Sequence, residues 1–201
     1  NIKLSLGLNG QCTSAILLEP DCPELFPALV DFSFLAADPA SHNDSSIDAA
    51  IHALRREGLE PEDVKSCLVT HQHGDHFDPR LMQRLPNARV FSDPDAGLPG
   101  AEPLTSRPFP DSIISLNTPG HGGPHASFII DLPQLDLSMC IAGDLIMSHA
   151  HFLSLDHPLS FSDYGAGMKS VRSVLEALAS RPSRFSMILP GHDIPFFAPV
   201  P

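Results

Sequence analysis

The chain is 201 residues long, enough for one domain that buries roughly 70% of its unfolded surface. Hydrophobic residues make up 42% of it, which excludes wholesale disorder, and no apolar run reaches the roughly 18 residues needed to cross a bilayer. Its 12 Lys and Arg against 24 Asp and Glu give a formal net charge of -12. This charge disfavours nucleic acid as a partner, because binding of nucleic acid depends on lysines and arginines that neutralise its phosphates. We therefore expect a single domain over residues 1–201 with no membrane span and with nucleic acid disfavoured as a partner.

The first third of the chain predicts two strands, at 13–19 and 28–34, separated by turn residues. A helix is expected over 46–57, with Gly58 as its stop signal. Four apolar residues recur at helical spacing in that segment and predict one buried face: Ile47, Ala50, Ile51 and Leu54.

The rest of the chain predicts more strands than helices. Up to residue 143 we expect strands at 66–70, 88–92, 112–117, 126–132 and 137–143, and a short helix at 79–85. A second clear helix is predicted over 164–179, followed by a strand at 185–190. The 21 prolines cluster in 94–110 and 194–201, which predicts loops and a tail there.

Several of these strands end close to a side chain that can bind a metal. The strand at 66–70 runs directly into His71, and Asp144 and His192 each follow an apolar strand. His121 comes a few residues after the strand at 112–117. Because strand ends can meet in space although they lie far apart in sequence, we expect these residues to converge.

The run from His71 to His76 has three imidazoles and one carboxylate within six residues, in the pattern HxHxDH. In an extended segment residues i and i+2 point the same way, so His71 and His73 can hold one ion. Gly74 allows a sharp turn, after which Asp75 and His76 face a second position. Imidazole nitrogen and carboxylate oxygen are ligands of zinc, iron and manganese.

The remaining ligands come from later in the chain. His121 could complete the first site, His192 the second, and Asp144 could bridge both with its two oxygens. A water shared by two ions would ionise near neutral pH. Asp75 is the candidate catalytic residue, because it could orient that water and carry its proton.

Four segments, in this order along the chain, resemble motifs of the metallo-β-lactamase superfamily. Residues 69–76 resemble its THxHxDH motif, 118–121 its TPGH element, 142–144 its GD element and 190–192 its PGH element. The stretch 118–124 also resembles a short branch called metallo-β-lactamase-domain-containing protein.

The resemblance implies a four-layer αββα sandwich of the α/β (α+β) class, with two mixed β-sheets packed face to face and helices outside. It implies a first metal site from His71, His73 and His121, and a second from Asp75, His76 and His192, with Asp144 bridging.

Residues 29–31 resemble the strand end that usually reads LVDTG in this superfamily. The resemblance implies that Asp31 steadies the HxHxDH loop by hydrogen bonds. Phe32 and Ser33 replace the usual Thr-Gly, so the geometry of this loop stays open.

Three further side chains are candidates for contact with a substrate. His149 and His151 follow Asp144 in a segment predicted as a loop, and Tyr164 stands where the second helix begins. The alternative for all three is an ordinary surface position. His125 is expected at the surface.

The leading functional hypothesis is hydrolysis of a small ester, thioester or lactone by hydroxide bound to two divalent metal ions. Zinc is the first expectation for the metal, with iron or manganese as alternatives. A related branch oxidises persulfides with one iron, which His71, His121 and Asp144 could hold. A phosphodiesterase or nuclease of the same fold is a third hypothesis, and a non-enzymatic metal-binding module is a fourth.

The cysteines and the chain ends bear on location and partners. None of the four cysteines has C-x-x-C spacing, and Cys67 and Cys140 lie in apolar runs that predict burial. A Cys12–Cys22 disulfide is left open, but a reducing cytoplasm is expected because no signal-peptide pattern begins the chain. A homodimer is a further hypothesis, because Phe196 and Phe197 near the tail could form a contact surface; the alternative is that they pack against their own domain.

Overall fold

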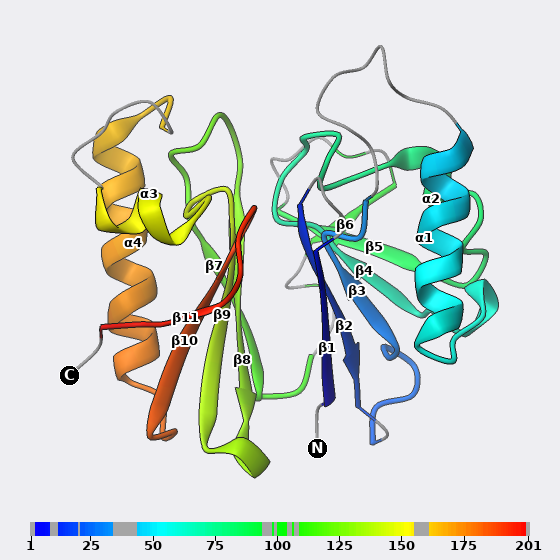
Figure 1. The fold of residues 1–201 in the computed structure, drawn as a ribbon, viewed down its shortest axis with the longest axis horizontal. Coiled ribbons are helices and arrows are strands. Elements are labelled where there is room, and N and C mark those ends of the chain that lie inside the picture. Colours follow the sequence, from blue (N-terminus) through cyan, green and yellow to red (C-terminus); the bar gives the residue numbers. More distant parts are fainter. Residues whose placement is uncertain are drawn as a thin grey trace.

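Two mixed β-sheets face each other, and helices cover the outer face of each (Figure 1). The computed structural model describes residues 3–8, 12–19, 21–33, 44–93, 98, 100–103, 106, 109–154 and 161–199. Within them, the order of layers is helix, sheet, sheet, helix. The predicted αββα sandwich with two mixed sheets is thereby confirmed.

The first sheet has the order β1-β2-β3-β4-β5-β6. Its strands β1, β2 and β3 are antiparallel neighbours, whereas β3 to β6 run parallel. The bounds are β1 Lys3–Leu8, β2 Thr13–Leu18, β3 Ala28–Val30, β4 Ser66–Leu68, β5 Arg89–Ser92 and β6 Glu102–Pro103.

The second sheet has the order β11-β10-β9-β8-β7, in which only β9 and β10 are parallel. Its bounds are β7 Ile113–Asn117, β8 Ala126–Leu132, β9 Leu137–Gly143, β10 Phe185–Pro190 and β11 Phe196–Phe197.

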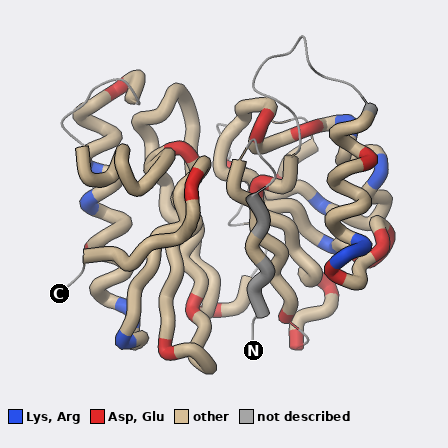
Figure 2. Tube along the Cα trace, in the orientation of Figure 1, with Lys and Arg blue, Asp and Glu red and all other residues tan. Residues whose placement is uncertain are grey.

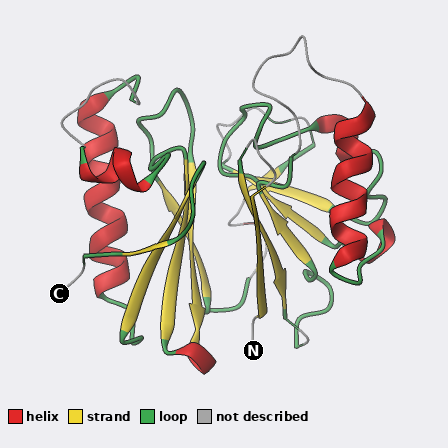
Figure 3. Ribbon diagram, in the orientation of Figure 1, coloured by secondary structure: helices red, strands yellow, loops and turns green. Residues whose placement is uncertain are grey.

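The long helices α1 and α4 form the two outer layers (Figure 3). Short helices accompany each of them. The bounds are α1 Asp44–Arg56, α2 Pro79–Met82, α3 His149–Leu153 and α4 Tyr164–Ala179, with 3-10 turns at Pro61–Asp63 and Pro133–Leu135. No helix among the described residues is long and apolar enough to cross a membrane.

Each sheet is covered on both faces, so its central strands are apolar at consecutive positions. In β8, Phe128 and Ile130 point into the core between the sheets, while Ile129 packs with residues of α4. In β3, Val30 points to the same central core and Leu29 packs with α1. This alternation follows from the two-residue period of a strand, and it explains why the sequence shows continuous apolar runs here.

Some predicted boundaries and loops are wrong. The strand expected at 28–34 ends at Val30, because Asp31 has a φ of 47° and such a backbone cannot continue a strand. The helix expected at 79–85 ends at Met82. Residues predicted as loop or tail form α3 and the two-residue strands β6 and β11, although much of 94–110 lies outside the described residues.

The alternatives that the sequence left open for the cysteines and the tail phenylalanines are decided by the structure. All four cysteines are free thiols, so the Cys12–Cys22 disulfide is not formed. Cys67 and Cys140 are buried as predicted, and burial raises the pKa of the Cys67 thiol to about 12. Phe196 is 9% exposed and packs with the α4 side of the second sheet, so only Phe197 is exposed.

Candidate metal centre

The loops after β4, β7, β9 and β10 gather at one edge of the sandwich, between the two sheets (Figure 1). The first sheet supplies the HxHxDH run, and the second supplies His121, Asp144 and His192. Acidic segments lie on both sides of this edge and also at the opposite ends of the strands, whereas basic segments of the described chain are absent from the edge between the sheets (Figure 2). The candidate centre is therefore built across the two sheets.

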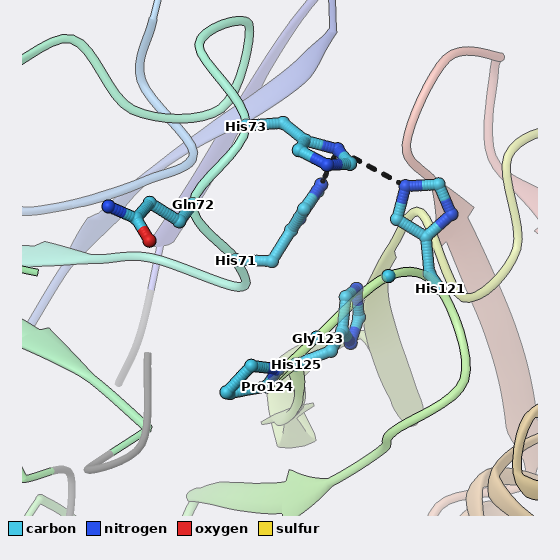
Figure 4. Close-up of a pocket in the computed structure, with 8 residues that line it drawn as sticks. His71, Gln72, His73, His121, Gly123, Pro124 and His125 are labelled. Atoms are coloured by element: carbon cyan, nitrogen blue, oxygen red, sulfur yellow. Dashed lines mark hydrogen bonds between the residues drawn. The ribbon is translucent and has the colours of Figure 1, made fainter. Parts of the chain in front are cut away.

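All seven predicted ligands are brought together in two groups. Within each group, one potential ligand atom per residue lies within 4.8 Å of the others. The first group is His71, His73, His121 and Asp144, and the second is Asp75, His76 and His192. Figure 4 shows His71 and His73 of the first sheet pointing toward His121 of the second.

Asp144 lies between the two groups and directs one oxygen to each. Its Oδ2 is 3.2 Å from His121 Nε2 and 3.8 Å from His71 Nε2. Its Oδ1 is 3.1 Å from His76 Nε2 and 3.0 Å from His192 Nε2. Burial alone would raise the pKa of Asp144, but His121, His192 and His76 outweigh it and hold the pKa far below its usual range.

Asp31 is buried directly beneath the HxHxDH loop and fixes its first histidine. Its Oδ1 accepts a 2.8 Å hydrogen bond from the backbone N–H of Thr70, and its Oδ2 accepts a 2.7 Å bond from the Thr70 hydroxyl. The Thr70 hydroxyl has then used its hydrogen, so it must accept from His71 Nδ1 at 3.0 Å. His71 therefore presents an unprotonated Nε2 to the centre.

The same carboxylate orients a second ring. His76 Nδ1 lies 2.9 Å from Asp31 Oδ2 and donates to it, since an ionised carboxylate only accepts. This leaves His76 Nε2 facing the centre, which is the arrangement by which metal-binding histidines are held in proteins. Asp31 thus takes the position that the resemblance implied, despite the Phe32-Ser33 departure.

Buried atoms in the centre fit a divalent cation. Asp31, Asp75 and Asp144 are 1%, 7% and 3% exposed, and their ion-pair partners are histidines. His76 Nε2 and Asp144 Oδ1 are both buried, yet neither makes a hydrogen bond of normal geometry. Buried carboxylates are costly unless positive charge offsets them, so this set of donors suits metal ions.

Two glycines allow the ligand loops to approach closely. A Cβ on Gly191 would lie 2.2 Å from Asp144 Oδ1, so only glycine fits before His192. A Cβ on Gly120 would lie 2.4 Å from the Cα of Gly167 in α4. The loop with His121 is thus seated directly on the helix. Ser170 reinforces this contact, because its hydroxyl donates a 2.7 Å bond to the carbonyl of Pro119.

His125 was expected at the surface, but it is 1% exposed. Its ring centroid lies 5.0 Å from that of His71, and both line a cavity of about 150 Å³ with His73 and His121 (Figure 4). Burial, with a smaller effect of His121, lowers the pKa of His125 to about 3, so the ring is neutral. The sequence did contain a signal for this burial, because His125 directly precedes β8, a strand that is buried on both faces.

A chain of hydroxyl groups fixes the tautomer of His125. Ser127 donates its hydroxyl hydrogen to the carbonyl of Ala142 at 3.1 Å, so it accepts from Thr118 at 2.9 Å. Thr118 in turn accepts from His125 Nδ1 at 2.8 Å. His125 therefore bears its hydrogen on Nδ1, and its unprotonated Nε2 is buried without a hydrogen-bond partner among the described residues.

The three candidate substrate residues take different places. His149 is exposed and stacks on Phe196 with a centroid distance of 4.4 Å. Tyr164 is 40% exposed at the start of α4, with its ring 6.3 Å from that of Phe161. His151 is half-buried in α3. None of the three belongs to the two ligand groups.

Comparison with known proteins gives partial sequence likenesses. No family model matches the chain. It is 34% identical over 88 residues to the hydroxyacylglutathione hydrolase of Xanthomonas oryzae pv. oryzae, covering 40% of this chain and 33% of that protein. It is 33% identical over 138 residues to the enzyme of the same name from Rhodopseudomonas palustris strain BisA53, covering 62% of this chain and 51% of the relative. The chain thus spans about a third to a half of these relatives.

Solved structures match over nearly the whole chain. An N-acyl homoserine lactone hydrolase with N-hexanoyl-L-homoserine at its catalytic metal centre has a TM-score of 0.70 at 19% identity, covering 94% of this chain and 82% of that one. A Thermotoga maritima protein assigned to the metallo-β-lactamases has a TM-score of 0.64 at 17% identity, covering 98% and 99%. The dizinc lactonase AidC matches at 0.63 and 14%, covering 90% and 72%.

Proposed function

Because the chain has the metallo-β-lactamase fold, we propose that it is a dinuclear metal-dependent hydrolase acting on a small lactone, ester or thioester. The observation that carries the proposal is the position of Asp144, with one oxygen facing each of two groups of ligand atoms. A carboxylate so placed can bridge two cations.

His71, His73 and His121 would hold one ion, and Asp75, His76 and His192 the other, with Asp144 shared. Zinc is the first choice for both, with iron or manganese as alternatives. When bound, two such ions would lower the pKa of a shared water and polarise the carbonyl of the substrate.

Asp75 is the proposed catalytic acid and base. It is 7% exposed, and its Oδ2 lies 3.6 Å from His192 Nε2 and 4.0 Å from His76 Nε2, at the side of the second group. From there its carboxylate can orient the attacking water, accept its proton and return that proton to the leaving oxygen or sulfur. Asp31 holds the rings of His71 and His76 in the tautomer that this arrangement needs.

The relatives support acyl-transfer chemistry. The hydroxyacylglutathione hydrolases are named for thioester cleavage, and the structural neighbours include lactonases. The complete second group, with Asp75, His76 and His192, does not favour the alternative with one iron. A homodimer and a cytoplasmic location stay predictions.

The first test is metal content, measured by plasma mass spectrometry on protein purified without chelators or a metal-affinity tag. We expect about two zinc or manganese ions per chain. Zinc-loaded protein would then be assayed on N-hexanoyl-L-homoserine lactone, S-lactoylglutathione and phenyl acetate. The Asp75→Asn variant should lose turnover, and its metal content, measured on the same sample, shows whether an ion is lost with the carboxylate. A single iron with oxygen uptake, or an empty site in metal-replete protein, would contradict the proposal.

A further inference from the structure

The two residues that follow Asp31 depart from the usual strand end of the superfamily. Phe32 and Ser33 stand where that strand end usually has Thr-Gly, and both are buried. Phe32 belongs to the same apolar cluster as Ile47 and Ile51 of α1. It therefore anchors the segment to the helical layer outside the first sheet, which leaves the role of Ser33 to be explained.

The hydroxyl of Ser33 reaches the HxHxDH run. It donates a 2.7 Å hydrogen bond to the backbone carbonyl of Gly74. A glycine at position 33, as in the usual strand end, has no side chain that could make this bond. The carbonyl of Gly74 belongs to the peptide unit that joins Gly74 to Asp75. Because a peptide unit is planar, a bond to its oxygen also restrains the Cα of Asp75.

Gly74 is the point of the run where such a restraint matters most. Glycine has no Cβ and therefore has more backbone freedom than any other residue. The turn that follows is closed at another oxygen, the carbonyl of His73, which accepts from the backbone N–H groups of His76 and Phe77 at 3.0 and 2.9 Å. The bond from Ser33 thus restrains a peptide unit that the turn itself does not use.

The segment that carries Ser33 is itself restrained by β2. The carbonyl of Asp31 accepts a 2.7 Å hydrogen bond from the hydroxyl of Ser14, and the thiol of Cys12 lies 3.3 Å from the same oxygen. The backbone N–H of Ser33 also donates to this carbonyl, at 3.1 Å. Ser33 is therefore a donor that the fold of the first sheet already holds in place.

Resting on the proposed function, we propose that Ser33 is a positioning residue whose hydroxyl orients the Gly74–Asp75 peptide unit for the second metal ion. Asp75 lies at the second group, with its Oδ2 3.6 Å from His192 Nε2. A carboxylate that is oriented before the ion binds loses less conformational entropy on binding, so the affinity is higher. The first group does not include Asp75, so the affinity for the first ion should depend much less on Ser33.

Two substitutions test the hydroxyl, and a third is the matched control. Ser33→Ala removes the donor, whereas Ser33→Thr keeps a hydroxyl on the same Cβ. Ser138→Ala is the control, because Ser138 is buried too and its hydroxyl donates a 2.6 Å bond to Asp131 Oδ1. Ser138 lies near the start of β9, at the opposite end of that strand from Asp144. Its loss therefore removes a buried hydrogen bond without touching the candidate centre.

Zinc binding is followed at each group separately. During a zinc titration, long-range proton–nitrogen NMR spectra report the first ion at His121 and the second at His192, and Tm is measured for each variant. We expect Ser33→Ala to weaken binding of the second ion about 3- to 10-fold, the effect of losing one hydrogen bond, with the first ion unaffected. Ser33→Thr should recover most of that loss. Ser138→Ala should bind both ions like the wild type although its Tm falls.

Two outcomes of the titration would overturn the proposal and leave the proposed hydrolase intact. One is an unchanged affinity for the second ion in Ser33→Ala. The other is equal weakening at both groups, which would show a general loss of stability. Wild-type protein that binds a single ion would instead overturn the proposed function, and this role of Ser33 with it.

Protein loaded with one zinc ion per chain tests the turn without the second ion and without turnover. Amide hydrogen exchange at His76 and Phe77, whose N–H groups close the turn, should be faster in Ser33→Ala than in the wild type and unchanged in Ser138→Ala. Equal exchange rates in Ser33→Ala and the wild type would overturn the proposal. This comparison needs only the Ala variants, so it decides the question even if Ser33→Thr fails to fold.

Discussion

At the scale of single residues, Asp31 determines more of the centre than any other side chain outside the ligand groups. Its φ of 47° ends β3 and turns the carboxylate beneath the HxHxDH loop. A non-glycine residue in this region is strained, and aspartate and asparagine tolerate it better than other residues. Its two oxygens then set the orientation of His71, through Thr70, and of His76.

Replacing Asp31 with Asn should weaken metal binding. Asn tolerates the same backbone. Its amide NH2 group, however, is a donor, and where it replaces Oδ2 it would face the Thr70 hydroxyl and His76 Nδ1, which are donors themselves. We expect zinc affinity to fall about 10- to 100-fold, as is typical when a partner of a ligating histidine is lost. Competition with a chromogenic chelator measures it, and far-UV circular dichroism serves as the control for folding. Unchanged zinc affinity would show that the two rings are held by other contacts.

His125 belongs to a buried chain of hydrogen bonds that can be tested separately. His125→Leu removes the donor to Thr118, whereas in His125→Asn the amide N–H can replace Nδ1–H. We expect the Leu variant to lose about 1–3 kcal/mol of unfolding free energy in urea titrations, and the Asn variant to lose less. Equal losses in the two variants would mean that packing against His71, rather than the hydrogen bond, is what His125 contributes.

At the scale of elements, α4 both covers the second sheet and supports the loop of His121. Its buried face packs Val171, Val174 and Leu178 against the sheet. Asp163, the N-cap directly before α4, accepts from the backbone N–H of Ala166. Its own backbone N–H donates to the carbonyl of Gly120. The helix is therefore fixed to the sheet along its length and to the candidate centre at its start.

Two glycines in that first turn should respond to alanine in opposite ways. Alanine usually favours an exposed helix by about 1 kcal/mol relative to glycine. At Gly165 a Cβ would meet only Asp163 Oδ1, at 3.5 Å, so Gly165→Ala should raise Tm slightly or leave it unchanged. At Gly167 a Cβ would collide with Phe161, at 2.6 Å. Gly167→Ala should therefore lower Tm and weaken zinc binding by displacing the His121 loop. Equal Tm values and zinc affinities in the two variants would show that this helix start does not position His121.

At the scale of the whole molecule, the candidate centre lies where the two sheets are joined. Thr13 of β2 donates its backbone N–H to the carbonyl of Gly191 at 2.6 Å, which ties the first sheet to the loop of His192. Between the sheets, Phe91 and Phe128 are 0% and 1% exposed in the shared core. The packing of the two sheets thus also holds the ligands of the two sheets close to one another.

Metal binding should consequently stabilise the whole fold. Cations that bind only the folded protein raise its unfolding free energy, by about 3 kcal/mol when free zinc is about 100 times the dissociation constant. They also offset the charge of three buried carboxylates in a chain with a net charge of -12. Calorimetry should show a Tm that falls on addition of a chelator and returns with zinc. The Asp144→Asn variant should show a smaller response, and equal Tm values with and without metal would contradict the coupling.

The sequence by itself determined the local features. Apolar runs predicted most strands, since a strand covered on both faces must be apolar at consecutive positions. The bounds of β8, β9 and α4 agree with the predicted ranges. The HxHxDH spacing predicted one half of the candidate centre, because all its residues lie within one short turn.

Only the tertiary structure decided which distant residues meet and which way single side chains point. His121, Asp144 and His192 reach the HxHxDH loop only because two sheets pack face to face. His125 is buried against His71, which lies far away in the chain. Backbone patterns depend on neighbours within a few residues, whereas the direction of a loop side chain depends on whatever the fold packs against it.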